Sequence, residues 1–141
     1  MNALLSFGYS MLARELTQVA WMVGLDPYLG YLHAPRYGRP ALALDLMEPF
    51  RPLVADSVSL TLVNNGEIQP ADFVERMGAV NLTREGRTKV LLGTERRLAQ
   101  EITHPAFGYR VAYRRVFEIE ARLLSRHLLG ELAVYQPLVT R

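Results

Sequence analysis

The chain has 141 residues, a length typical of one domain, and half of its residues are hydrophobic, which excludes an intrinsically disordered chain. It contains no Cys, so disulfides, thiolate chemistry and cysteine-based zinc sites are excluded, and we expect a cytoplasmic protein. The net charge is only +2, but fifteen Arg stand against one Lys, a choice of cation that suits phosphate binding and mildly favours a nucleic-acid partner. A GC-rich genome would produce the same excess of Arg, so both explanations stay open.

The first predicted helix covers about residues 3–23. Its hydrophobic residues recur at helical spacing, at Leu5, Leu12, Leu16, Val19 and Val23. Gly24 predicts the end of this helix and the loop after it. No basic segment precedes the helix, and no uncharged run reaches the length of a bilayer span, so we expect neither a signal peptide nor a membrane protein.

Pro and Gly residues predict a loop over residues 34–40. A second helix is expected to begin between Ala43 and Pro49 and to run to Val63, with one hydrophobic face. The predicted members of that face are Phe50, Val54, Val58 and either Thr61 or Leu62. The "NNG" sequence at 64–66 predicts its end.

The second half of the chain is also predicted to be helical. A short helix is expected after Pro70, a brief extended piece at 78–82, and a long helix that Thr83 caps and that ends near Ile102. The last long helix covers about 109–129. The sequence therefore predicts an all-α fold: one helical domain over 1–141, with four long helices, one short helix and at most a very short strand.

One stretch, residues 32–52, collects polar side chains that suit a metal site. Asp45 and Glu48 are three residues apart and would share a helix face, and His33 lies in the preceding loop. One imidazole and two carboxylates suit Mg²⁺ or Mn²⁺, and such an ion can activate a hydroxyl and stabilise a phosphoryl transition state. The alternative is structural: Asp-x-x-Glu is also a capping-box pattern, and a lone His is more often a surface or packed residue.

Three arginines surround this cluster: Arg36, Arg39 and Arg51. Beside a metal they would hold phosphate groups, and without one they are solvated charges. Four more arginines form a stripe on the last helix: Arg110, Arg114, Arg122 and Arg126. With Glu118 in the gap, the favoured interpretation is an exposed face of Arg–Glu pairs, and the alternative is a track for the DNA backbone.

The two remaining histidines suggest no chemistry. His104 precedes a Pro and is interpreted as a loop residue, and His127 as a partner of a helix C-terminus. The segment "NLTREGRTKVLL" resembles the part that follows the wing of winged-helix repressors of the multiple-antibiotic-resistance type. The recognition helix and the two-stranded wing that should precede it are not evident, so this alternative is weak.

The chain as a whole resembles the C-terminal helical domain of the CRISPR-associated adaptation integrases. The segments that carry the resemblance follow one another in the family's order: "NALLSFGYSMLARELT", "GLDPYLGYLH", "YGRPALALDLMEPFRP", "NNGEI", "LTREGRTKV" and "YRRVFEIEARLLSRHLLGE". The resemblance implies a metal-dependent enzyme of CRISPR spacer acquisition. In that family a 3′-hydroxyl of captured DNA attacks a phosphodiester at the edge of the repeat, and the same site cuts DNA as an endonuclease.

The resemblance also implies roles for particular residues. His33 and Glu48 match metal ligands, Asp45 matches a close acidic partner, and Arg51 matches a basic residue expected to touch DNA. The implied cofactor is Mg²⁺ or Mn²⁺. The implied partners are prespacer and repeat DNA, a second copy of the chain, and a smaller second adaptation protein with a ferredoxin-like fold.

One departure from the family concerns the start of the chain. The family's first metal ligand, a Glu, and its N-terminal β-rich domain both precede the "NALLSFGYS" motif, with which this sequence begins. The expectation is therefore a fragment that carries part of the metal site and is inactive alone.

Overall fold

The structure is a computed structural model that describes residues 2–28 and 41–132. Its elements, in chain order, are α1 (Asn2–Met22), α2 (Ala41–Met47), the π-helix η1 (Arg51–Asp56), α3 (Ser57–Asn64), the 3₁₀ turn η2 (Pro70–Asp72), β1 (Phe73–Arg76), β2 (Ala79–Leu82), α4 (Arg84–Ala99), β3 (Glu101–Thr103), β4 (Arg110–Ala112) and α5 (Tyr113–Leu128).

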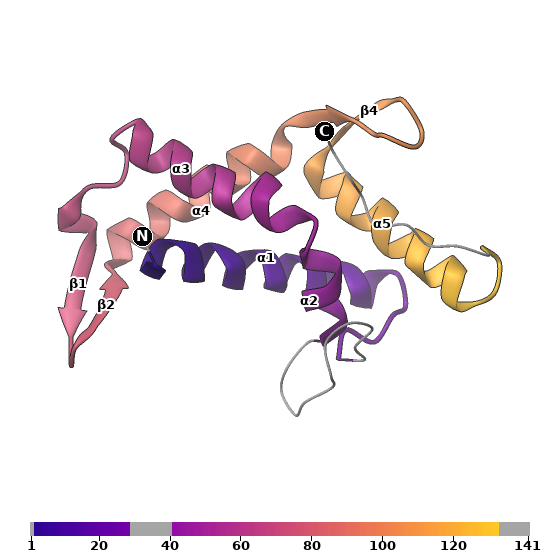
Figure 1. The fold of residues 1–141 in the computed structure, drawn as a ribbon, viewed down its shortest axis with the longest axis horizontal. Coiled ribbons are helices and arrows are strands. Elements are labelled where there is room, and N and C mark those ends of the chain that lie inside the picture. Colours follow the sequence, from indigo (N-terminus) through magenta and orange to yellow (C-terminus); the bar gives the residue numbers. More distant parts are fainter. Residues whose placement is uncertain (1, 29–40, 133–141) are drawn as a thin grey trace.

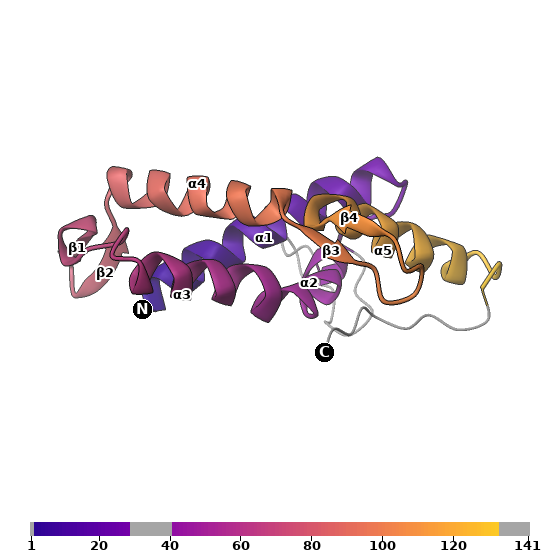
Figure 2. The same cartoon turned by 90° about the horizontal axis from the view of Figure 1, so that it is seen from above.

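Helix α1 is the central element of the described part, and it contacts α2, η1, α3, α4, α5 and β2. Figure 2 shows α3 and α4 running side by side along the described part, and α1 crossing beneath them. Figure 1 shows α2 and α5 near its other end, and the β1–β2 hairpin projecting beyond the start of α1. None of the described helices is long and apolar enough to cross a bilayer.

Two hydrophobic clusters hold these elements together, one at each end of α1. The larger cluster joins the second half of α1 to α2, η1 and α5, and in it the rings of Phe50 and Phe117 meet edge to face at 4.5 Å. The smaller cluster joins Leu4 to Val58, Leu62 and Val90, on α3 and α4. Helix α1 therefore connects the two clusters, because its apolar face contributes buried side chains to both of them.

The predicted first helix is confirmed almost to the residue, and its predicted core positions Leu12, Leu16 and Val19 are buried. At its start, Leu4 is buried in place of the predicted Leu5. The cap of α4 is also confirmed, since Thr83 Oγ1 accepts the Gly86 amide hydrogen at 3.0 Å. The single-domain division of 1–141 stays a prediction.

The prediction of an all-α fold is wrong, because the described residues also form two antiparallel hairpins. Strand β1 pairs with β2, and β3 pairs with β4. The first hairpin turns at Met77 and Gly78, whose φ angles are +52° and +79°. Such a turn usually has Asn or Asp at its first position. Because Met77 stands there instead, the sequence contained no signal for this hairpin. It also lies where the winged-helix alternative required a wing.

The predicted second helix is in fact three pieces. Helix α2 ends at Met47, Glu48 and Pro49 form a turn, and η1 and α3 follow. Pro49 and Pro52 have no amide hydrogen to donate, which prevents a continuous α-helix through this region. The last two long helices are shorter than predicted because β3 takes residues 101–103 and β4 takes residues 110–112.

Candidate functional site

The predicted acidic pair lies at the corner between α2 and η1. Asp45 is in α2, Glu48 is in the turn after it, and Arg51 opens η1. The amide hydrogen of Glu48 points to the Asp45 carbonyl oxygen at 3.4 Å, and that of Arg51 to the Glu48 carbonyl oxygen at 3.4 Å. The two acids therefore lie within one turn, as their spacing predicted. Asp45 and Glu48 are both partly buried.

The capping-box alternative for this pair is excluded. Helix α2 begins at Ala41, so Asp45 lies inside the helix and does not cap it. His33, Arg36 and Arg39 lie outside the described residues, so their predicted place beside the acids stays a prediction. Among residues 2–28 and 41–132, no three His, Asp or Glu side chains lie close enough together to hold a metal ion.

Glu48 is the first of four side chains that contact one another in series: Glu48, Arg51, Tyr9 and Asp56. Arg51 Nη1 donates to Glu48 Oε1 at 3.2 Å, and both side chains are about 40% exposed. The guanidinium of Arg51 lies over the ring of Tyr9, 4.5 Å from its centroid. The Tyr9 hydroxyl donates to Asp56 Oδ1 at 2.5 Å. This hydrogen bond raises the pKa of Tyr9, because it stabilises the protonated hydroxyl beside a carboxylate.

No sequence pattern predicted that Tyr9 and Asp56 belong to this network. Tyr9 is 42 residues before Arg51 in the sequence, and Asp56 follows Arg51 by five residues, which is not a shared face of an α-helix. The π-helix η1 changes that geometry, since its turn spans i to i+5. A π-helical segment cannot be recognised from hydrophobic periodicity, although the two prolines marked the region as irregular.

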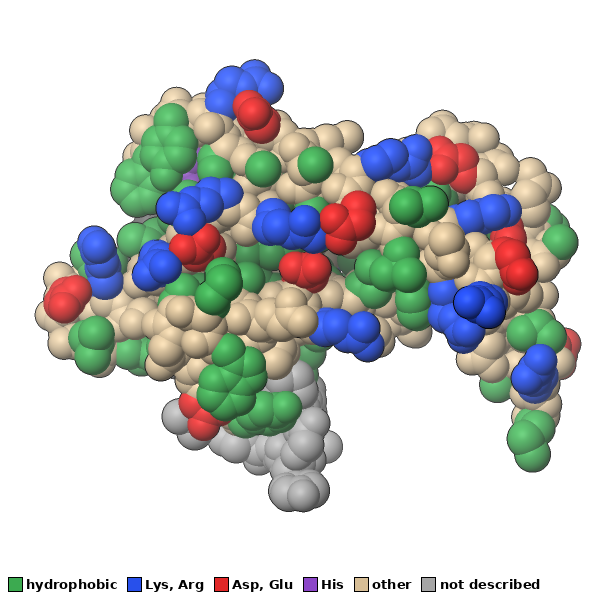
Figure 3. Space-filling model, turned by 180° about the vertical axis from the view of Figure 1, so that it is seen from behind, with side chains coloured by type: hydrophobic (Ala, Val, Ile, Leu, Met, Phe, Trp, Pro, Cys, Tyr) green, Lys and Arg blue, Asp and Glu red, His purple; other side chains and the backbone are tan. Residues whose placement is uncertain are grey.

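The arginines of the predicted stripe are engaged in ion pairs. Arg114 contacts Glu95 at 2.9 Å and Glu15 at 3.3 Å, and Arg122 contacts Glu118 at 2.9 Å. Arg110 pairs with Glu101 at 3.3 Å, from β4 and not from the helix. Figure 3 shows such acidic and basic side chains next to one another over this face. The favoured interpretation, an exposed helix face of Arg–Glu pairs, is confirmed for Arg122 and Glu118. Arg114 and Arg110 are also paired, but with carboxylates outside α5.

A different set of arginines lies along a groove between α1 and the start of α4. Arg14, Arg84 and Arg87 line it, together with the apolar side chains of Phe7 and Leu91. All three arginines are exposed, and no carboxylate within the described ranges pairs with them. Sequence reasoning missed this surface because it joins residues about 70 positions apart; the available signal was the "TREGR" segment at the start of α4.

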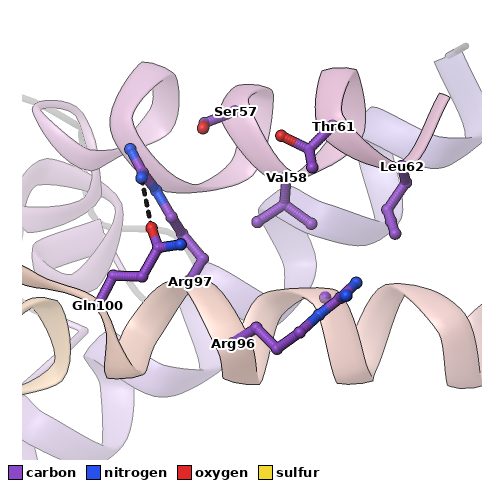
Figure 4. Close-up of a pocket in the computed structure, with 8 residues that line it drawn as sticks. Ser57, Val58, Thr61, Leu62, Arg96, Arg97 and Gln100 are labelled. Atoms are coloured by element: carbon purple, nitrogen blue, oxygen red, sulfur yellow. Dashed lines mark hydrogen bonds between the residues drawn. The ribbon is translucent and has the colours of Figure 1, made fainter. Parts of the chain in front are cut away.

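A smaller pocket lies between α3 and α4 and is shown in Figure 4. Ser57 and Thr61 line it from α3, Arg96 and Arg97 line it from α4, and Gln100 lines it from just after the end of α4. Its arginines already have partners in the protein. Arg97 donates to Gln100 Oε1 at 2.6 Å and to the Leu53 carbonyl oxygen at 2.8 Å, and Arg96 donates to Glu67 at 2.7 Å. The pocket is therefore a less favourable phosphate site than the groove between α1 and α4.

The remaining two histidines, His104 and His127, lie away from the acidic pair in the sequence. His104 was predicted to be a loop residue, and it lies in the loop between β3 and β4, but it is buried, and its Nδ1 accepts the Ala106 amide hydrogen at 3.1 Å. Its Nε2 therefore carries the proton, 3.3 Å from Glu120 Oε1. His127 lies in the last turn of α5, where a partner of the helix C-terminus was predicted.

Comparison with known proteins places the chain in a family. A sequence model of the CRISPR associated protein Cas1 matches residues 1–96. A CRISPR-associated exonuclease Cas4/endonuclease Cas1 fusion of Geobacter sulfurreducens is 58% identical over 140 residues, which are 99% of this chain and 25% of that protein.

Two solved structures share the fold. A Cas1 protein from Thermotoga maritima has a TM-score of 0.88 and 33% identity, over 94% of this chain and 41% of that one. A casposase bound to integration product has a TM-score of 0.89 and 26% identity, over 99% of this chain and 41% of that one. The chain belongs to the Cas1 family, as its sequence segments predicted, and it spans less than half the length of these relatives.

Proposed function

We propose that the chain carries part of the active site of a CRISPR integrase and endonuclease. The reaction is attack of a DNA 3′-hydroxyl on a phosphodiester of the repeat, or hydrolysis of a phosphodiester in the same site. The observation that carries the proposal is the match of residues 1–96 to the Cas1 family, which includes Asp45, Glu48 and Arg51. The likeness to a casposase bound to integration product supports strand transfer as the reaction type.

The acidic pair fits a hard divalent cation. Asp45 and Glu48 offer carboxylate oxygens within one helical turn, and Mg²⁺ and Mn²⁺ prefer such ligands. In this proposal they hold the ion together with His33. When bound, the ion polarises the scissile phosphate and lowers the pKa of the attacking hydroxyl.

Two sets of arginines are proposed to bind the DNA backbone. Arg51 stands beside Glu48, where its charge stabilises the phosphate that reacts, and Arg36 and Arg39 are proposed to contribute in the same way. The groove lined by Arg14, Arg84 and Arg87 is proposed to hold a more distant stretch of backbone, because its cations have no carboxylate partner among the described residues. DNA, a second copy of the chain and a smaller second adaptation protein are the proposed partners.

The groove gives a direct test of DNA binding. Each Arg–phosphate contact contributes about one unit to the slope of log affinity against log salt concentration. We expect Arg87→Ala to weaken binding of a labelled branched duplex and to reduce that slope by about one. Arg122→Ala is the matched control, because it removes an exposed charge that already pairs with Glu118, and it should change little. Equal effects of the two substitutions, measured by fluorescence anisotropy, would contradict a DNA-binding groove.

A non-catalytic DNA-binding domain is the second candidate, since the groove alone supports it. Nicking of a supercoiled repeat plasmid with Mn²⁺ separates the two candidates. We expect little activity from this chain alone, because Glu48 already pairs with Arg51 at 3.2 Å, and a divalent ion has to compete with this charge for the carboxylate. Activity that disappears in both His33→Ala and Glu48→Ala would show a complete catalytic site. DNA binding that both substitutions and Mn²⁺ leave unchanged would favour the non-catalytic domain.

A further inference from the structure

Tyr9 connects the two ends of the π-helix η1. Its hydroxyl is hydrogen-bonded to Asp56 at 2.5 Å, and its ring lies under the guanidinium of Arg51 at 4.5 Å. Residues five apart would diverge on an α-helix, but the longer turn of η1 allows both to reach one tyrosine on α1. The small residues Gly8 and Ala55 meet at 3.6 Å, measured from a Cβ position built on Gly8, so α1 and η1 approach closely beside Tyr9.

We propose that Tyr9 is a positioning residue, which holds the Arg51 guanidinium beside Glu48 in the orientation that receives a DNA phosphate. The inference rests on the proposed function, because that proposal gives Arg51 its phosphate. Tyr9 itself touches neither DNA nor the reacting atoms and acts through Arg51.

The geometry restricts Arg51 from two directions. A free arginine side chain has several rotamers, and selecting one of them costs entropy on binding. Here the Tyr9 ring lies under the guanidinium, with its centroid 4.5 Å from the guanidinium carbon, and Glu48 engages the Nη1 nitrogen at 3.2 Å. The donors on Nε and Nη2 are not used by the Glu48 pair. A planar fork held in this way is ready to bind a phosphate without further ordering.

The hydroxyl of Tyr9 interacts with both Asp56 and Arg51, whereas its ring lies under Arg51 alone. The hydrogen bond to Asp56 fixes the ring against η1, while the ring supports the charge of Arg51. Tyr9→Phe keeps the support under Arg51 and loses the bond to Asp56, and Tyr9→Leu loses both. The two substitutions therefore separate the contribution of the ring from that of the hydroxyl.

The test is a double-mutant cycle on the affinity of this chain for a labelled branched duplex at fixed salt. We expect Arg51→Ala to weaken binding about tenfold, as for a lost hydrogen bond to a charged group. Tyr9→Leu should weaken it about threefold, within the range of an exposed cation–π contact. Because Tyr9 acts through Arg51, the double variant should bind about as weakly as Arg51→Ala. Tyr9→Phe should stay within about twofold of the parent.

Each result has a defined meaning. A double variant about thirtyfold weaker, the product of the two single effects, would show that Tyr9 acts independently and would overturn the inference. Parent-like affinity of Tyr9→Leu, with a loss in Arg51→Ala, would overturn it as well and would leave the proposed function intact. Unchanged affinity in Arg51→Ala would overturn the proposed role of Arg51, and the inference with it.

A second measurement, without DNA, distinguishes positioning from general loss of structure. The Nε–H resonance of Arg51 should be shifted by the ring current of Tyr9, and it should keep its position in Tyr9→Phe but move in Tyr9→Leu. Tyr109→Leu is the matched control, because it removes a half-exposed ring on the β3–β4 hairpin with no contact to Arg51. Equal movement of the Arg51 resonance in both Leu variants would contradict specific positioning.

Discussion

At the scale of single residues, Gly86 is a position where the fold depends on the absence of a side chain. It lies in the first turn of α4, where that helix meets η2. A Cβ atom placed on it would lie 2.6 Å from the backbone oxygen of Asp72, closer than real contacts allow. The Asp72 carboxylate is buried there and is bonded to the Gln69 amide at 2.8 Å and to Lys89 at 2.9 Å, so this backbone has little freedom to move.

We therefore expect Gly86→Ala to lower the free energy of unfolding by about 1–3 kcal/mol, as overpacking does. Gly8→Ala is the matched control. It is also a helical glycine, but its added Cβ would meet Ala55 at an ordinary 3.6 Å, so the gain in helix propensity should leave stability unchanged or raise it by about 0.5–1 kcal/mol. Urea unfolding of the two variants measures the difference. Equal changes in the free energy of unfolding of the two variants would show that the Asp72 backbone leaves room for a side chain at position 86.

At the scale of elements, the β1–β2 hairpin has a turn in which one residue, Met77, does not suit the backbone conformation. Met77 has φ +52° and its side chain is fully exposed, whereas Gly78 has φ +79° and suits such a turn. Met77→Asn should raise the free energy of unfolding by about 0.5–1 kcal/mol, because Asn adopts this conformation more readily and Asn-Gly is the preferred pair. Gly78→Ala should have the opposite sign. Urea unfolding that shows no gain from Met77→Asn would mean that hairpin formation is not limited by its turn.

The Met77–Gly78 turn is one of the features of the fold that could not be predicted from the sequence. The sequence predicted the first helix from the periodicity of Leu12, Leu16 and Val19, and it predicted the cap at Thr83. Each of these signals lies within a single short segment of the chain. The hairpins could not be predicted, since strands of three or four residues have too little periodicity and Met77 conceals the turn. In the candidate site, the three-residue spacing predicted that Asp45 and Glu48 lie close together. The contact of Tyr9 with Arg51 could not be predicted, because it depends on a π-helix and on packing between distant segments.

At the scale of the whole molecule, the metal site must bring together residues from separate parts of the chain. The described residues provide Asp45 and Glu48, and Glu48 already has a positive partner, Arg51, at 3.2 Å. A divalent ion has to compete with this charge for the carboxylate, and two carboxylates without further ligands hold such ions weakly. The arginine that suits a DNA phosphate is thus unfavourable for metal binding in the absence of DNA.

We therefore expect Mn²⁺ to bind this chain with a dissociation constant no tighter than about 10⁻³ M, measured by isothermal titration calorimetry. Arg51→Ala should tighten binding several-fold, because it removes the competing charge, and Glu48→Gln should abolish what binding remains. Arg122→Ala provides the control for a general change of charge, since its partner Glu118 lies in α5 and not beside the acidic pair. Micromolar affinity in the parent, lost in His33→Ala, would instead show that the chain completes the metal site without further ligands. In that case the pairing of Arg51 with Glu48 would not limit the binding of the ion.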